Sequence, residues 1–133
     1  MAYSDYLIKV GTAKIPNKYI SLESFKVTKH TQDIDSYRDA TGVLHRNVLS
    51  HRVMKAEFTT PTMYAKDVNA LMTLINGAYS DSTTKTATVS FYDAESDTYV
   101  SMTSYVPDVE FNIKENSPRG FIYNPVRIAF IGY

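Results

Sequence analysis

Three histidines are the side chains best suited to bind a metal. His45 and His51 are six residues apart, so they share one face of an extended strand, and His30 could approach them across a hairpin. A zinc site needs three or four ligands in fixed geometry, and the chain has no His-x-x-x-His motif and no cysteine. We therefore expect no metal, and we interpret the histidines as exposed or interfacial groups.

A run of alternating carboxylates is the second candidate for chemistry. Residues 33–39 read Asp-Ile-Asp-Ser-Tyr-Arg-Asp, which resembles the start of a calcium-binding loop. The sixth position of such a loop must be Gly and the twelfth a bidentate Glu, but Arg38 and Leu44 occupy them. The run is more typical of charges on a solvated or intersubunit ribbon.

Catalytic signatures are missing from the sequence. It contains no Cys nucleophile, no Gly-x-Ser-x-Gly elbow and no Gly-rich phosphate loop or dinucleotide fingerprint among its five glycines. We expect that the protein is not an enzyme and that it uses no cofactor.

Length and charge limit the class of protein further. The 133 residues suit one domain, residues 1–133. Fourteen basic and fourteen acidic residues give a formal net charge of zero, which argues against sequence-specific binding of nucleic acid. The start has no export signal and no apolar stretch is long enough for a bilayer, so we expect no membrane association.

The elements that would position these residues are mostly strands. Apolar residues alternate with polar ones in segments around residues 6–10, 25–27, 54–59, 87–91, 100–102, 109–113 and 126–130. Only residues 63–78 show helical spacing, with Val68, Leu71, Met72 and Ile75 on one stripe. Thr62 is the expected N-cap and Gly77 the expected end. The sequence predicts a mainly β, antiparallel sandwich or barrel with one flanking helix.

Residues 25–58 do not fit a compact domain of this size. Their one turn signal is Asp39-Ala40-Thr41-Gly42, so we expect one long hairpin with arms near residues 24–38 and 43–59. Arms of about 15 residues reach ~50 Å, beyond the ~36 Å diameter of the domain. Either the hairpin projects, or it curls back or breaks near residues 33–36. Projection would leave a ribbon that needs cover, and a second copy is the obvious partner.

The candidate functional residues are therefore those of a subunit interface. We expect charged groups to set register and partner choice, while apolar side chains enter a groove of the neighbour. The charged candidates are Asp33, Asp35, Arg38, Asp39, His45, Arg46 and Arg52, and the apolar ones are Ile34, Tyr37, Leu44 and Leu49.

Several segments resemble a family of short tail-region proteins of Firmicute phages and prophages. They are residues 6–11 (Tyr-Leu-Ile-Lys-Val-Gly), 32–46 (Gln-Asp-Ile-Asp-Ser-Tyr-Arg-Asp-Ala-Thr-Gly-Val-Leu-His-Arg), 105–108 and 123–130. The resemblance implies a tail-tube or distal-tail fold, in which two packed antiparallel sheets, one helix and a long hairpin build a hexameric ring.

The same resemblance implies a structural protein of the virion tail, made in the cytoplasm of the host bacterium and placed at the tail tip or baseplate. Its partners would be further copies of itself and other tail proteins, namely the tube, the tape measure and the tail hub, with DNA passing through the lumen. The alternatives are the major tail tube subunit, and a tail terminator or head–tail joining adaptor. A small wall-active enzyme is the weakest alternative.

Overall fold

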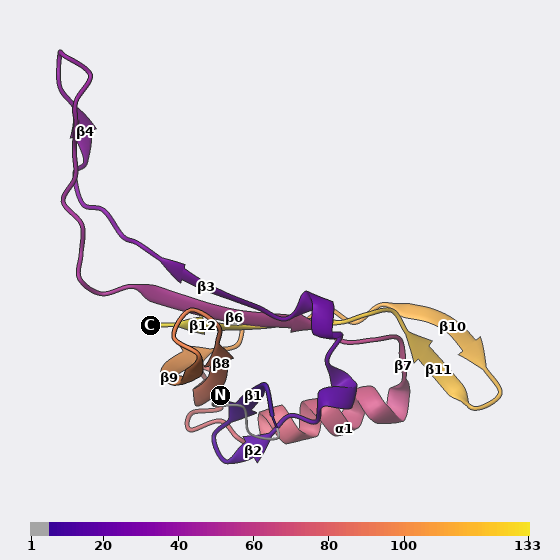
Figure 1. Ribbon diagram of the computed structural model, residues 1–133. Coiled ribbons are helices and arrows are strands. Elements are labelled where there is room, and N and C mark those ends of the chain that lie inside the picture. Colours follow the sequence, from indigo (N-terminus) through magenta and orange to yellow (C-terminus); the bar gives the residue numbers. More distant parts are fainter. Residues whose placement is uncertain (1–5) are drawn as a thin grey trace.

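The body of the protein is built on one antiparallel sheet of seven strands (Figure 1). The computed structural model describes residues 6–133. The strand order across the sheet is β2-β1-β8-β9-β12-β6-β3. The strands are β1 (Ile8–Val10), β2 (Ala13–Lys14), β3 (Lys26–His30), β6 (Val53–Thr59), β8 (Thr86–Asp93), β9 (Thr98–Tyr105) and β12 (Arg127–Gly132). Two short 3-10 helices, η1 (Asn17–Tyr19) and η2 (Leu22–Ser24), lead into β3.

Alternation in the sequence decides which side of each strand is buried. Ala87, Val89 and Phe91 of β8 are buried, and so are Phe58 of β6 and Phe130 of β12. These side chains from distant strands belong to one hydrophobic core, although β8 and β6 run in clearly different directions (Figure 1). The predicted mainly β, antiparallel fold with one helix is confirmed.

Helix α1 (Ala65–Asn76) covers one side of this core. Its predicted stripe is confirmed, since Val68, Leu71 and Ile75 are buried, and Gly77 is its C-cap. The predicted start was wrong, because Met63–Tyr64 form the short strand β7 and the N-cap is Tyr64 rather than Thr62. A pairing between β7 and strand β11 (Gly120–Tyr123) holds residues 63–64 extended. Within residues 6–133 no helix has the length and apolar character needed to cross a bilayer.

The outer face of β8 and β9 carries only hydroxyl side chains. Register pairs these residues directly across the two strands, with Ser90 Oγ 2.8 Å from Ser101 Oγ. Their alternation with buried residues places all eight on the face away from the core. They are Thr86, Thr88, Ser90 and Tyr92 on β8, and Tyr99, Ser101, Thr103 and Tyr105 on β9. Along these two strands, the outer face has no charged side chain.

The region between β3 and β6 leaves the body as a long arm (Figure 1). We call residues 30–52 the arm; none of them is buried. Both alternatives from the sequence occur together, because the hairpin projects and its strands also break. Only Tyr37–Arg38 (β4) and Leu44–His45 (β5) are strands within it, and Asp35 interrupts the first side at a φ of 54°. The break at Asp35 lies within residues 33–36, where the sequence had left a break open.

A second, shorter hairpin projects from the opposite end of the body (Figure 1). Strands β10 (Ile113–Ser117) and β11 pair with each other, and β11 also pairs with β7. The expected strand at residues 109–113 was wrong, since β10 only begins at Ile113. Residues 117–120 form the tight end of this hairpin, where Gly120 has a φ of 120°. We call residues 111–123 the second hairpin.

One ion pair ties the base of the arm to the body. Lys29 of β3 donates to Asp93 Oδ2 at 2.7 Å, and Asp93 is buried at the end of β8. Asp93 also accepts from Ser96 Oγ and from the backbone N–H of Glu95, so it shapes the β8–β9 turn. Burial raises the pKa of Asp93, but the bonds from Lys29 and Ser96 outweigh it and hold the pKa below its ordinary value.

Candidate subunit interface

The tip of the arm is a turn built around one carboxylate. Asp39 Oδ1 accepts from the backbone N–H of Thr41 at 2.9 Å, the hydroxyl of Thr41 at 2.6 Å and the backbone N–H of Val43 at 3.1 Å. The backbone N–H of Gly42 donates to the carbonyl of Asp39, and Gly42 has the positive φ that such a turn requires. Hydrogen bonds from Thr41 and His45 lower the pKa of Asp39 to about 2. The predicted turn at residues 39–42 is confirmed.

Cross-strand contacts fix the shape of the arm behind this turn. The guanidinium of Arg46 binds Asp33 in two places, with Nε and Nη2 at 3.0 and 2.9 Å from the two carboxylate oxygens. This bidentate bond lowers the pKa of Asp33. The rings of Tyr37 and His45 stack at 4.9 Å between centroids. The arm is exposed, and contacts among its own side chains hold its two sides together.

The expected charge pairs therefore form within one chain. Asp33 pairs with Arg46, and Asp39 lies 2.9 Å from His45 Nε2, so these four groups already have partners in the monomer. Arg38 donates to the carbonyl of Gly42. For these groups, a role in contacts between subunits stays a prediction.

The apolar candidates are all left in solvent. Six large hydrophobic side chains of the arm are 39–59% exposed. They are Ile34, Tyr37, Val43, Leu44, Val48 and Leu49, which include every apolar candidate named from the sequence. A monomeric protein rarely leaves so many apolar side chains exposed on one projection, and such patches mark interaction sites.

Sequence reasoning missed a second group of exposed apolar side chains, on the second hairpin. Phe111, Ile113 and Phe121 are 44–52% exposed. Ile113 lies directly opposite Tyr123, and the ring of Phe111 meets the ring of Tyr123 edge-on at 6.4 Å. Phe121 shares their face because it lies two residues before Tyr123 on β11. The signal was present in Ser117-Pro118-Arg119-Gly120, whose Pro and Gly are spaced as in a β-turn.

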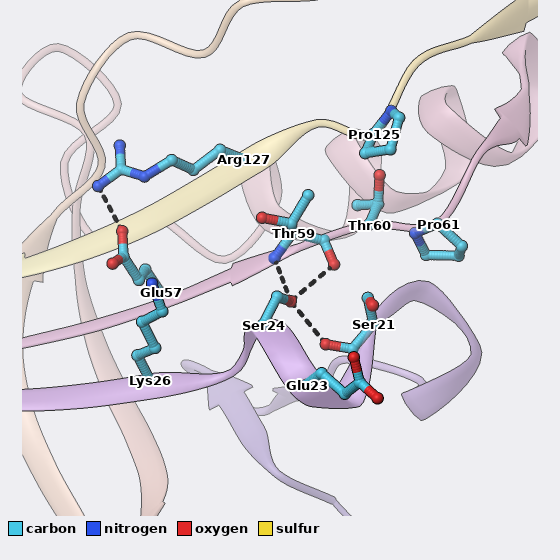
Figure 2. A pocket seen from close by; sticks show the side chains of 10 residues that line it. All are labelled: Ser21, Glu23, Ser24, Lys26, Glu57, Thr59, Thr60, Pro61, Pro125 and Arg127. Carbon is cyan, nitrogen blue, oxygen red and sulfur yellow. Dashed lines mark hydrogen bonds and ion pairs between the residues drawn. The ribbon is translucent and has the colours of Figure 1, made fainter.

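A groove lies at the starts of β3 and β12 and the end of β6, and charged and polar side chains line it together with Pro61 and Pro125 (Figure 2). It encloses about 500 Å³. The backbone N–H of Thr59 donates to Ser24 Oγ at 2.7 Å, and Ser24 Oγ donates to the carbonyl of Ser21. Glu57 forms ion pairs with Arg127 and Lys55. These lining groups serve to hold strands together.

The histidines do not gather into one site. His45 contacts Asp39, while His51 Nε2 lies 2.6 Å from the carbonyl oxygen of Tyr133 at the base of the arm. Across residues 6–133, no three His, Cys, Asp or Glu side chains come together in a group able to hold a metal ion.

Comparison with known structures shows a shared fold. A chain in the tail of an empty gene transfer agent particle with C6 symmetry is 14% identical; the match covers 97% of this chain and 91% of that chain, with a TM-score of 0.52. A chain in the virion of a native gene transfer agent particle is 13% identical, with the same coverage and TM-score. No curated protein matches the chain.

A match to one protein family extends over the full length of the chain. The family model aligns with the whole chain, from residue 1 to residue 133. The match thus takes in the body, the arm and the second hairpin. On this basis the chain belongs to DUF6711, a family of unknown function.

Proposed function

We propose that this protein is a structural component of a phage-type tail, in which six copies close into a ring at the tail tip or baseplate. The observation that carries the proposal is the arm, a projection of 23 residues with none buried and six large apolar side chains in solvent. Another surface that covers these apolar side chains would add to the stability that the arm's own contacts provide.

Two further findings support a ring in a tail. The fold is shared with a chain in a gene transfer agent tail of C6 symmetry. The sequence also resembles short tail-region proteins of Firmicute phages and prophages. On this proposal the partners are further copies and the neighbouring tube, tape-measure and hub proteins, and DNA passes through the lumen.

The major tail tube subunit is the second candidate function. It is supported by the likeness to a chain from a tail treated by helical refinement, since a helical repeat requires many copies of its subunit. Copy number separates the two candidates. Labelled antibodies against the chain should mark one end of the particle for a tail-tip ring, and the whole tail for a tube subunit.

Native mass spectrometry of the purified protein tests the ring directly. We expect a closed hexamer for the natural chain. The double variant Val43→Asp, Leu44→Asp, which places two carboxylates among the apolar side chains of the arm, should be monomeric. Its circular dichroism should match that of the natural chain, because both positions are exposed and the fold of the monomer does not depend on them. A natural chain that stays monomeric at high concentration would overturn the proposal.

A further inference from the structure

We propose that the second hairpin is the surface that receives the arm of a neighbouring copy. The inference rests on the proposed ring and names the two surfaces that meet between neighbouring copies, the arm and the second hairpin. The exposed apolar face of Phe111, Ile113 and Phe121 in one copy packs against the apolar side chains of the arm in the next.

Ring geometry requires two different patches on every subunit. In a cyclic assembly of more than two copies each contact is head-to-tail, so a subunit uses one surface toward one neighbour and another surface toward the other. The arm supplies one patch. The second must lie elsewhere on the body and must complement an apolar partner.

The distribution of exposed apolar side chains identifies the second patch. Eleven large hydrophobic side chains are exposed in the described residues, six on the arm and three on the second hairpin. The other two are Leu22 and Tyr133, far apart in the sequence, and the Tyr133 hydroxyl lies 2.7 Å from Thr86 Oγ1. The two projections lie at opposite ends of the body, so one copy can use them toward two different neighbours (Figure 1).

Two other open surfaces are poor matches for an apolar arm. The outer face of β8 and β9 carries hydroxyl groups, and burying it under apolar side chains would strip these groups of water without replacement bonds. The groove of Figure 2 is lined by Glu23, Lys26, Glu57 and Arg127 among others. An apolar occupant would remove water from these charged groups without replacing its hydrogen bonds. The second hairpin offers aromatic and aliphatic side chains instead.

The edge of the second hairpin also suits a ribbon-shaped partner. β10 pairs on one side only, with β11, so its other edge presents unpaired backbone groups. The arm is itself a two-stranded ribbon with open edges. When the two hairpins pack together, their open edges come close to each other. Backbone groups on these edges can then form additional hydrogen bonds.

A mixing experiment with two double variants tests the contact. The arm variant Val43→Asp, Leu44→Asp keeps an intact second hairpin, and the hairpin variant Ile113→Asp, Phe121→Asp keeps an intact arm. Each alone should be monomeric in native mass spectrometry. Mixed in equal amounts, they should give a one-to-one heterodimer and nothing larger, because only one productive contact remains between them. Leu22→Asp, an equally exposed apolar site outside both projections, should leave the natural oligomer intact.

The outcomes separate this inference from the proposed function. If the natural chain is hexameric but the hairpin variant also forms a hexamer, the arm docks elsewhere and the inference fails while the ring stands. If each variant is monomeric but the mixture gives no heterodimer, the inference fails in the same way. If the natural chain is monomeric, both fail.

Disulfide trapping gives a second test that does not depend on loss of assembly. Because the chain has no cysteine, each introduced thiol is unique. Chains with Val43→Cys or Leu44→Cys, whose side chains alternate across the ribbon, are each mixed with Phe121→Cys and oxidised. We expect a covalent dimer for at least one of the two mixtures. Thr88→Cys on the hydroxyl face is the control and should give none; equal trapping with Thr88→Cys would overturn the inference.

Discussion

The body and the arm of this protein are held together by different forces. In the body, large side chains such as Phe58, Phe91 and Phe130 are fully buried, and polar groups face outward. In the arm no side chain is buried, and the order comes from the Asp39 turn, the Asp33–Arg46 pair and the Tyr37–His45 stack.

The comparison shows how one chain can carry a stable body and a projection that keeps its apolar side chains exposed. Hydrophobic burial stabilises the body and is roughly proportional to the apolar area removed from water. The arm removes little area, so its local hydrogen bonds define its shape while its apolar side chains stay available. Substitutions should therefore affect the two regions in different ways.

The largest expected effect is on the body. Phe58→Ala empties a fully buried site between β3 and β12, and it should lower the free energy of unfolding by about 3–5 kcal/mol. Tyr37→Ala in the arm, at a side chain that is 59% exposed, should change the free energy of unfolding of the monomer by less than about 0.5 kcal/mol. Urea unfolding of both variants measures the contrast, and equal losses would contradict the division into two regions.

An intermediate effect is expected where the arm joins the body. Lys29→Met leaves the buried Asp93 without its cationic partner and should lower the thermal midpoint. Glu95→Gln is the matched control, since Glu95 lies 3.5 Å from the same Lys29 nitrogen but is well exposed, and it should have little effect.

The pH dependence of this junction has a defined sign. The pKa of Asp93 in the folded protein lies below its ordinary value of 3.8, so the ionised group stabilises the fold above that pH and this stabilisation is lost as the pH falls further. The difference between the natural chain and Lys29→Met should therefore shrink in acid. A difference that stays constant from pH 7 to pH 3 would contradict the assigned pair.

The smallest and most local effect is expected at the tip of the arm. Asp39→Ala removes the acceptor of the turn, and hydrogen exchange at the Thr41 and Val43 amides should speed up roughly fivefold with unchanged global stability. Because the pKa of Asp39 is lowered to about 2, the turn in the natural chain should hold at pH 4 and loosen only as the pH falls toward 2. If the Thr41 and Val43 amides already lost their protection from hydrogen exchange at pH 4, this pKa would be contradicted.

Much of the body could be predicted from the sequence, because burial imposes a period on the chain. Ala87, Val89 and Phe91 alternate with hydroxyl residues, and the helical stripe of Val68, Leu71 and Ile75 is equally regular. The same reliance on alternation led to a wrong prediction at the second hairpin. Phe111 and Ile113 continue the alternation of Val109, but they face solvent rather than the core, and period alone does not distinguish the two.

The pairing inside the arm could not be predicted from residue types. Asp33, Arg46, Asp39 and His45 suit contacts within a chain as well as contacts between chains. Their partners depend on register, which the left-handed backbone at Asp35 shifts. The turn at residues 39–42 was predictable, because Asp and Gly at its ends are required by its geometry.

The row of hydroxyl groups on β8 and β9 has a consequence of its own. The stripe consists of uncharged hydroxyl groups, and charged groups border it, since Lys9 of β1 lies opposite Ser90 and the Tyr92 hydroxyl donates to Asp97. A molecule that contacts the stripe alone would therefore find hydroxyl groups to hydrogen-bond and no partner for an ion pair, which only the bordering residues could supply.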